Sequence, residues 1–484
     1  MSRVALTLLV MVMTLISGCT VGPDFQRPDA RQAPGYLAAG EAAPGVVAGR
    51  PAATLGDGPA ERWWTAFGSS ELDALVERAI ANNYSLQASN ATLAAARDRL
   101  RAITGKQRPQ VDASVRAEQQ QINLAAMGFS SLGGIPIANP EFHLYSVGGG
   151  VSYDLDLFGG VRRQVERSAA QVEAQQRQTE AAHLVIAGQT VNQILTIAAI
   201  RAQIATADAL LQEDQRNIDL TEKRRKAGEG TLVEVLNARS QYTADRGELP
   251  QLGQQLIEAR HQLATLIGVT PDELGTTDFE LAQLTLPANI PVALPSELVH
   301  RRPDILQSEA DLHAATAAIG VATARLYPDI TLGVSLTQAA PDVRDLTRNA
   351  FRAYDVFAGL TAPVFHGGAL RAERDAAMNE ARAAAATYQQ TVIDAFGQVA
   401  DLLAALDSDA RSVANQAESV QVAQRSLHLS RRSFEVGNSS LLQVLDSERL
   451  HQRARYALVR AQTRQYLNVA RLYVATAGGW SGVQ

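Results

Sequence analysis

The chain has 484 residues, a formal net charge of −6 and an aromatic content of only 5%. The acidic balance argues against a nucleic-acid partner, and abundant alanine with few aromatic residues indicates closely packed long helices. The sequence also contains no phosphate-binding Walker loop, no His-Glu-x-x-His pair and no nucleophile elbow. We therefore expect no enzymatic activity, no bound metal and no cofactor.

Residues 1–18 have the features of a signal peptide. Arg3 precedes an apolar run at residues 5–16, which has the length of a signal-peptide core and is too short to span a bilayer. Serine and glycine then precede Cys19, and small residues before a cysteine are what lipoprotein signal peptidase recognises. We predict that Cys19, the one cysteine in the chain, is lipidated. A plain secretory signal with an incidental thiol is the alternative.

The segment after the cysteine predicts an anchored tether. Thr20, rather than aspartate, would be the second mature residue, which favours sorting to the cell outer membrane, and a triacylated cysteine anchors stably. Residues 19–60 are rich in proline, glycine and alanine and read as an extended lipidated tether. No later stretch reaches about 18 apolar residues, so we expect no transmembrane helix, and any membrane crossing would use strands.

After residue 60 the sequence repeats itself at an offset of roughly 210–220 residues, which indicates duplicated structural units. We assign the first repeat to residues 61–290 and the second to residues 291–484. Three blocks correspond in the same order: Pro109 with Pro328, the glycine motifs at 158–160 with 365–368, and the segments 228–237 with 437–446.

Four segments alternate between apolar and polar residues, which is the period of a β-strand. They predict strands at about 110–122 and 145–158 in the first repeat, and at about 328–339 and 352–364 in the second. Each is long enough for a tilted membrane strand. A soluble sandwich shows the same alternation, but four strands separated by long helical stretches do not make a sandwich.

The remaining sequence predicts helices. Long helices are expected at 160–227 and 368–436, each roughly 100 Å long at 1.5 Å per residue. Return helices are expected at 231–268 and 439–477. The first return helix carries an apolar residue at every seventh position, which is typical of a coiled coil, and Pro250 should kink it. The fold class is therefore mainly α with a small membrane β part.

Four strands cannot stand alone in lipid, because open edges leave backbone groups unpaired at several kcal/mol each. A dimer would supply eight strands and a trimer twelve. An eight-stranded barrel is filled by its own side chains, whereas a larger one can hold water. Because the polar strand faces suit a wet lumen, we expect three or more copies.

Several segments resemble the outer membrane efflux protein family, also called outer membrane factors or TolC-like proteins, in its NodT-type lipoprotein branch. The resemblance covers essentially the whole mature chain. It implies a homotrimer with a shared twelve-stranded β-barrel and a long coiled-coil α-barrel across the periplasm. The matching segments are Cys19–Phe25 with Arg27-Pro28, Trp63-Trp64 through Phe67, Glu258–Gly268, Leu294–Leu298 through Arg301-Arg302-Pro303-Asp304, and Ile319–Ala322 with Tyr327-Pro328.

The resemblance also implies a function and partners. The chain would form a passive duct that carries small molecules such as drugs to the exterior. Its partners would be a periplasmic adaptor (membrane fusion protein) and an inner-membrane pump of the resistance-nodulation-division type, with outer-membrane lipid held through acylated Cys19. Two alternatives stay open: a duct of the same fold for secreted proteins or metal ions, and a coiled-coil structural lipoprotein without a pore.

Two glycine-containing turns are expected at the periplasmic tips, because glycine permits a tight helix reversal with positive φ. By resemblance, these tips dock the adaptor. The candidate docking residues are Gly228, Thr231 and Leu232 in the first tip, and Gly437, Ser440 and Leu441 in the second. The alternative is that both segments are only turns.

Acidic residues follow each tip. By resemblance, Asp446 occupies a position whose aspartates narrow the entrance of the duct, and Glu234 matches an acidic position of the first repeat. Like charges converging on an axis repel, which would make a conditional gate and a cation site. Gln443 stands where some members carry a second acidic ring, and Phe434 replaces a tyrosine, so a gate locked by Tyr–Asp and Arg–Asp links is not expected. The alternative for Asp446 is a solvated helix charge.

Overall fold

The computed structural model describes residues 20–29, 35–37, 51–56, 58–123, 131–132, 135–136, 139–275 and 278–477. Cys19 and the expected signal peptide lie outside these residues. The chain forms two compact units, and each takes segments from both sequence repeats. Unit 1 comprises Met1–Arg27, Ala94–Glu173 and Glu309–Ala386, and unit 2 comprises Pro28–Leu93, Ala174–Ser308 and Thr387–Gln484. The sequence repeats are therefore not the compact units of the fold.

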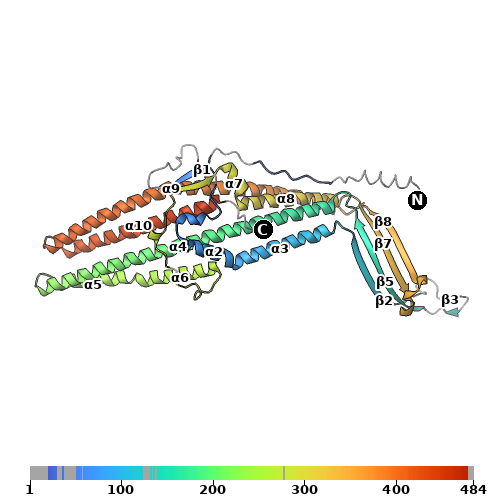
Figure 1. Ribbon diagram of the computed structural model, residues 1–484, viewed down its shortest axis with the longest axis horizontal. Helices are drawn as coiled ribbons and strands as arrows, with labels where there is room; N and C mark the ends of the chain where they lie inside the picture. The colour runs from blue at the N-terminus through green and yellow to red at the C-terminus, as the bar shows by residue number, and fades with distance from the viewer. Residues whose placement is uncertain are drawn as a thin grey trace. The chain divides into compact units, whose positions relative to one another are not determined.

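Unit 1 contains a four-stranded antiparallel sheet with the order β2-β5-β7-β8 (Figure 1). The pairing of β5 with β7 joins the hairpin of the first repeat to the hairpin of the second, and β2 and β8 form the two edges. The strands are β2 at Gln110–Gln121, β5 at Glu141–Asp154, β7 at Asp329–Ala340 and β8 at Arg352–Thr361, with a small β3–β4 pair at Ser131–Leu132 and Ile135–Pro136.

One face of this sheet is apolar and exposed. Val111, Val151, Val334 and Val356 lie in register across the four strands, with exposed fractions of 74%, 41%, 50% and 68%. The neighbouring row on the opposite face is Asp112, Gly150, Ser335 and Asp355. An exposed apolar patch on this scale marks a surface that contacts a membrane or another protein.

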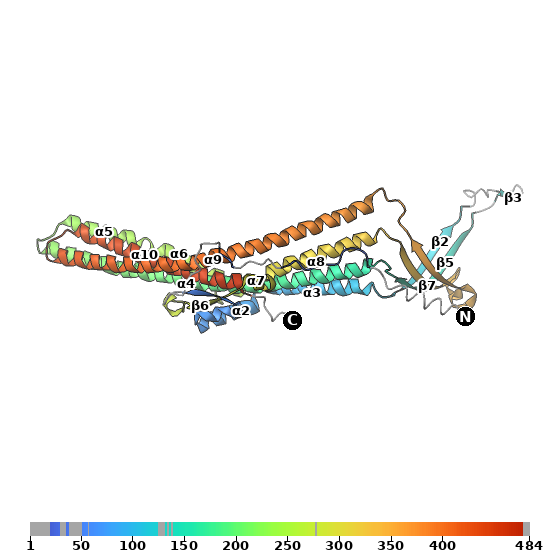
Figure 2. The same ribbon diagram turned by 90° about the horizontal axis from the view of Figure 1, so that it is seen from above.

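Long helices make up most of the rest. In Figures 1 and 2, α4 forms a hairpin with α5, and α9 forms one with α10. The helices are α2 at Ser70–Asn82, α3 at Tyr84–Gly105, α4 at Gly160–Lys226, α5 at Leu232–Arg246, α6 at Leu249–Ile267, α7 at Pro295–Arg301, α8 at Pro303–Ala324, α9 at Ala369–Glu435 and α10 at Leu441–Thr476.

The first return helix corrects one expectation. Pro250 does not kink a continuous helix; the helix is broken, because α5 ends at Arg246 and α6 begins at Leu249 with Pro250 in its first turn. A proline ring clashes with the carbonyl four residues earlier, here that of Arg246, whereas the first turn of a helix tolerates proline. In the second repeat, α10 runs from Leu441 to Thr476 as one helix.

One long helix passes a simple test for a membrane span. α4 is long and apolar enough, by length and composition, to cross a membrane, with an 18-residue window of mean hydropathy 1.5. However, 44% of that window is buried inside the protein, and Val191, Ile194 and Leu195 of this helix are completely buried in the main core. The packing is that of a core helix, whose apolar residues are covered by its own chain.

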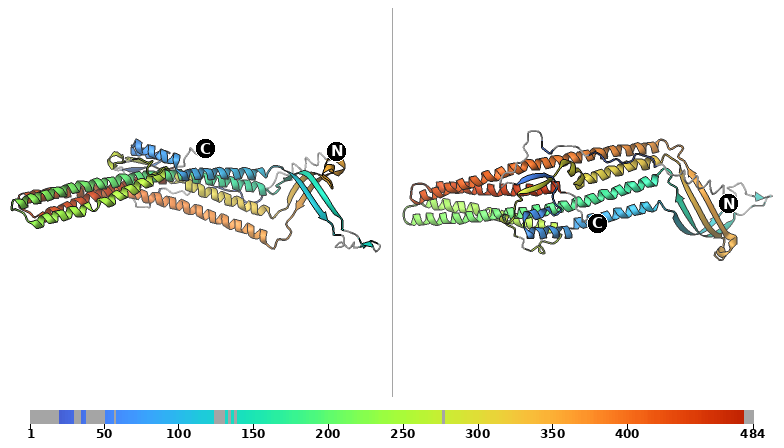
Figure 3. Two further views of the ribbon diagram at one scale, coloured as in Figure 1. Left: turned by 90° about the horizontal axis from the view of Figure 1, so that it is seen from below. Right: turned by 45° about the horizontal axis from the view of Figure 1, so that its top comes forward.

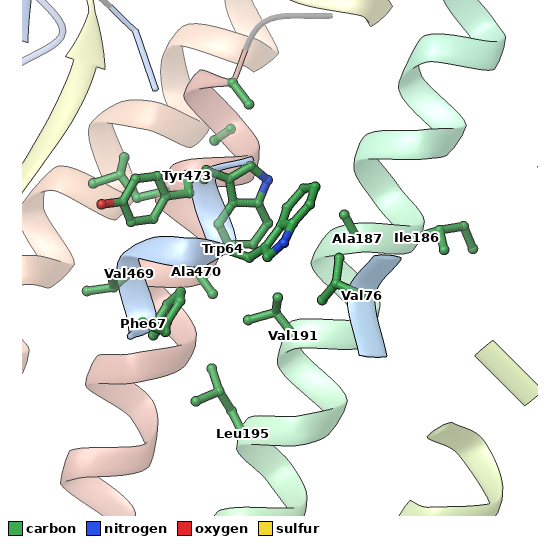
Figure 4. Packing of buried hydrophobic residues seen from close by; sticks show 14 of the residues in the cluster. Trp64, Phe67, Val76, Ile186, Ala187, Val191, Leu195, Val469, Ala470 and Tyr473 are labelled. Carbon is green, nitrogen blue, oxygen red and sulfur yellow. The ribbon is translucent and has the colours of Figure 1, made fainter. Parts of the chain in front are cut away.

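The main core lies in unit 2 and joins both repeats. Trp64 and Phe67, from the 3-10 helix at Trp63–Phe67, lie between Val191 of α4 and Tyr473 of α10 (Figure 4). Trp63 stacks on Tyr473 with ring centroids 5.5 Å apart. Beside this core, β1 at Ala52–Gly56 pairs in parallel with β6 at Asn289–Ala293.

The described residues 20–27, here called the N-terminal segment, dock on unit 1. The Val21 amide donates to the Phe158 carbonyl at 3.1 Å. Arg163, which is 4% exposed, donates to the carbonyls of Val21 and Gly22 at 3.2 and 3.3 Å and to an Asp24 carboxylate oxygen at 2.6 Å. One buried guanidinium therefore holds three residues of the segment.

The contact between Gly22 and Gly320 gives a test. Gly22 has a φ of +93°, and a Cβ on it would lie 2.5 Å from the Gly320 Cα. Gly22→Ala should therefore detach the N-terminal segment, and hydrogen exchange at the Val21 amide should become faster. Gly35→Ala is the control, because an added Cβ there meets no atom within 4 Å. Unchanged exchange in Gly22→Ala would show that this close approach does not hold the segment.

Candidate functional site

Two turns of the same geometry join the long helices to their return helices in unit 2 (Figure 3). Gly228 and Gly437 each have a φ of +79°, a left-handed conformation that glycine adopts without strain. Each turn is closed by a bond typical of a glycine-terminated helix. These bonds run from the Glu229 amide to the Arg224 carbonyl at 2.9 Å and from the Asn438 amide to the Ser433 carbonyl at 2.8 Å.

The helices that follow the turns begin differently. Thr231 caps α5, and its hydroxyl accepts from the Glu234 amide at 3.3 Å while its own amide donates to the Glu234 carboxylate at 2.8 Å. Ser440 precedes α10 without a side-chain cap bond. The Glu234 carboxylate therefore stabilises the start of α5. To act as a gate residue, it would first have to break its hydrogen bond within this capping box.

The two tips also present different surfaces. Leu232 is 58% exposed, whereas Leu441, at the corresponding position, is 2% exposed. Leu441 packs in a small core with Phe434, Ile218 and neighbouring apolar residues. The first tip therefore offers more apolar surface to a partner. The exposed apolar residues are Leu232, Val233 and Leu236 at the first tip, and Val436 and Leu442 at the second.

Arg224 links the first tip to the second. Its guanidinium donates to the Phe434 carbonyl at 3.0 Å and lies over the Phe434 ring, 4.4 Å from the centroid. Phe434 is 2% exposed and occupies the last turn of α9, where helix carbonyls lack intrahelical donors. The Phe434 carbonyl also accepts from the Gly437 amide at 3.0 Å, so Arg224 supplies a second donor to it and makes a cation–π contact. This link could not be predicted from the sequence, because it joins residues from different repeats.

Asp446 and Gln443 are exposed on α10. Asp446 makes no ion pair with another residue that the structure describes. Two residues further on, Glu448 is 4% exposed, because it lies on the packed face of the same helix. The structure therefore leaves the Asp446 carboxylate free to face water or a further chain. Within the described ranges, no group of three or more His, Cys, Asp or Glu residues is placed to hold a metal ion.

A buried polar layer joins α4, α5, α9 and α10. Its residues are not among the site residues that the sequence predicted. Glu448 accepts from the Asn217 amide group at 2.6 Å and from Arg431 at 2.5 Å, and Arg431 also pairs with Glu213. The spacing of polar residues in α4 could have predicted this layer. Asp214, Asn217 and Thr221 recur at the spacing of a buried helix face and are 1%, 6% and 2% exposed.

The link between the tips predicts a stability effect. Arg224→Ala should lower the free energy of unfolding by about 1–3 kcal/mol, because a charged hydrogen bond to a carbonyl and a cation–π contact are both lost. Arg225→Ala is the control, since Arg225 is exposed on the next position. Denaturant midpoints of the purified protein measure both changes. Equal midpoints for the two variants would mean that Arg224 contributes no more than an exposed arginine.

Comparisons with known proteins agree with this geometry. The chain is 33% identical to the pyoverdine export outer membrane protein OpmQ of Pseudomonas aeruginosa, over 87% of each chain. It is 27% identical to nodulation protein T of Rhizobium leguminosarum bv. trifolii, over 97% of this chain and 96% of that one. The solved outer-membrane channel OprN superimposes with a TM-score of 0.85 at 27% identity, over 96% of this chain and all of that chain.

These matches confirm three expectations from the sequence: the family, the mainly helical fold with a small β part and two repeats, and the outer-membrane location. The sequence profile of outer membrane efflux proteins matches residues 75–269 and again residues 294–478, one match in each repeat. The chain belongs to the outer membrane efflux protein family.

Proposed function

We propose that three copies of this chain form a passive duct through the outer membrane, as one component of a tripartite efflux system. The observation that carries the proposal is the four-stranded sheet, which has an exposed apolar face and two edges that no other described strand pairs with. Lipid would cover the valine row, and the polar row that contains Asp112 and Asp355 would face a wet lumen. The duct catalyses no reaction.

The strand directions support closure between copies. All three pairings in the sheet are antiparallel, so β8 of one copy can pair with β2 of the next in the same antiparallel sense. Three sheets then close a twelve-stranded barrel. A two-copy barrel of eight strands would fill its interior with side chains and leave no channel.

We further propose that the two tips dock the hairpin of a periplasmic adaptor, which is held on an inner-membrane pump of the resistance-nodulation-division type. Gly228 and Gly437 shape the turns, and the residues proposed to contact the adaptor are Thr231, Leu232 and Ser440. Exposed Leu232 supports this role directly. Leu441 is buried and would support the surface from below.

The cargo is proposed to be small molecules such as drugs or siderophores. Support comes from the relatives, which include a pyoverdine export protein of P. aeruginosa at 33% identity and a toluene efflux pump protein of Pseudomonas putida at 27%. A relative of 26% identity from Escherichia coli is a cation efflux protein, so metal-ion export is the second candidate. Acylation of Cys19 would anchor each copy in the outer membrane.

At the entrance, Asp446 is the proposed gate residue, because its carboxylate is exposed and makes no ion pair with the described residues. Three such carboxylates converging on the axis of a trimer would repel one another and attract cations. Gln443, exposed on the same helix, adds no charge. Glu234 is a weaker candidate, because its carboxylate already accepts from the Thr231 amide.

This gate gives a conductance test. Asp446→Ala should raise the single-channel conductance of the purified protein in a planar bilayer and weaken its preference for cations, because the converging charges are gone. Glu229→Ala is the control, since it removes an exposed acid at the other tip. The gate proposal fails if Asp446→Ala conducts like the unmodified protein. The duct proposal fails if the unmodified protein forms no channel.

The docking role gives a second test. Gly437→Trp should abolish efflux, measured as drug resistance of the cells, because a bulky side chain would stand on the docking surface. Gly437→Asn is the matched control, because asparagine accepts the left-handed conformation at φ +79° without that bulk. Normal resistance with Gly437→Trp would contradict docking at this tip. Equal loss in both variants would point to the turn rather than the surface.

A further inference from the structure

The polar layer between the four helices leaves one carboxyl group without a donor. The layer consists of Glu213, Asp214 and Asn217 of α4, Gln241 and Asp245 of α5, Arg431 of α9, and Glu448 and His451 of α10. Its side-chain amides and its guanidinium already donate to other groups. Asn217 and Arg431 donate to Glu448, and Arg431 also pairs with Glu213. The Gln241 amide donates to Asp245 at 2.8 Å.

Asp214 is the group left over. Its side chain is 1% exposed, and neither carboxylate oxygen has a hydrogen-bond partner among the described residues when both oxygens are treated as acceptors. A buried carboxylate without a donor is costly by several kcal/mol, and such groups usually become neutral instead. After burial itself, the Asp245 carboxyl group contributes most to raising the pKa of Asp214. Two carboxyl groups can bond only if one of them carries a proton.

The surroundings of Asp245 explain which partner holds the proton. Asp245 lines an open groove of about 560 Å³ together with Gln241, Arg449 and Arg453. A separate cavity of about 230 Å³ is lined by Glu213, Arg431, Glu448 and His451. Asp214 lines neither cavity, so solvent can support a charge on Asp245 and not one on Asp214.

We propose that Asp214 and Asp245 share one proton, and that this proton fastens α4 to α5. Protonated Asp214 donates to the Asp245 carboxylate, which satisfies both buried groups at once. Loss of the proton places two negative charges together between the helices and weakens their packing. The inference concerns helix packing within one copy and does not rest on the proposed duct function.

The charges around the pair favour the neutral form of Asp214. Burial, with the Asp245 carboxyl next to it, raises the pKa of Asp214 to about 8, and Glu448 and Glu213 add to this. On α10, burial and the nearby Arg455 and Arg431 lower the pKa of His451, so it supplies no positive charge at neutral pH. Arg431 of α9 is held by Glu448 and Glu213.

The sign of the pH effect follows from linkage. The pKa of Asp214 is higher in the folded chain than in the unfolded chain, so the folded state binds the extra proton. Its stabilising contribution is complete below the unfolded pKa, near 4, and is lost as the pH rises through about 8. The thermal unfolding temperature should therefore fall between about pH 5 and pH 9.

Asp214→Asn is the decisive variant. The asparagine amide can donate to Asp245 but cannot ionise, so the variant should lose most of the fall in unfolding temperature between pH 5 and pH 9. Asp208→Asn is the matched control, because it removes an exposed aspartate from the same helix and should leave the fall unchanged. The proposal is overturned if Asp214→Asn retains the full pH dependence of the unmodified protein.

Infrared spectroscopy of the full-length protein provides a second readout that does not depend on unfolding. At pH 7 the unmodified protein should show the carbonyl stretch of a protonated carboxyl group, and this band should disappear above about pH 9. It should persist in Asp208→Asn and be missing from Asp214→Asn at every pH above 6. The proposal is wrong if the band is absent at pH 7. It is also wrong if chelation of metal ions changes the band, because a bound cation rather than a proton would then lie between the two carboxyl groups.

Discussion

Strands in a membrane need a partner for each backbone N–H and C=O group, since lipid offers none. In this chain β5 and β7 satisfy that requirement, whereas β2 and β8 each have one side without a partner strand in the described sheet. The valine row on one face adds a second demand, because it requires an apolar covering. Pairing β8 with β2 of another copy meets the first demand, and lipid meets the second. The proposed trimer, its lumen and its gate all depend on this open sheet.

The packing of the helices differs along their length. Its main core, around Trp64 and Phe67, is apolar and joins both repeats. Toward the tips a polar layer around Asp214 and the Arg224–Phe434 link accompany a second, smaller apolar core at Leu441. Regions that must open are commonly drawn from the less stable parts of a structure. A smaller apolar core with polar contacts near the tips would suit the entrance of the proposed duct.

Elements governed by local pattern could be predicted from the sequence. Alternation with period two locates strands, the absence of proline marks long helices, and Gly228 and Gly437 do hold the left-handed turn positions. The sequence could not show that Pro250 breaks its helix, because a proline near a possible helix start is compatible with both a kink and a break. Hydropathy alone also could not show that the apolar stretch of α4 lies in a core.

Most of the features that could not be predicted from the sequence are contacts between residues far apart in the chain. Arg224 and Phe434 lie in different repeats, as do Asn217 and Glu448, and only the packing of the helices brings them together. Glu234 is different, because the Thr231–Glu234 spacing is that of a capping box and is visible in the sequence. The resemblance to a gate position predicts a different role for the same carboxylate.

The number of copies in the assembled protein tests the central claim most directly. Native mass spectrometry of the full-length protein, extracted from the outer membrane in detergent, counts the copies in each particle. We expect particles with the mass of three chains, because three four-stranded sheets close a barrel wide enough to hold water. Particles of one or two chains would contradict it, since their strands could not enclose a channel.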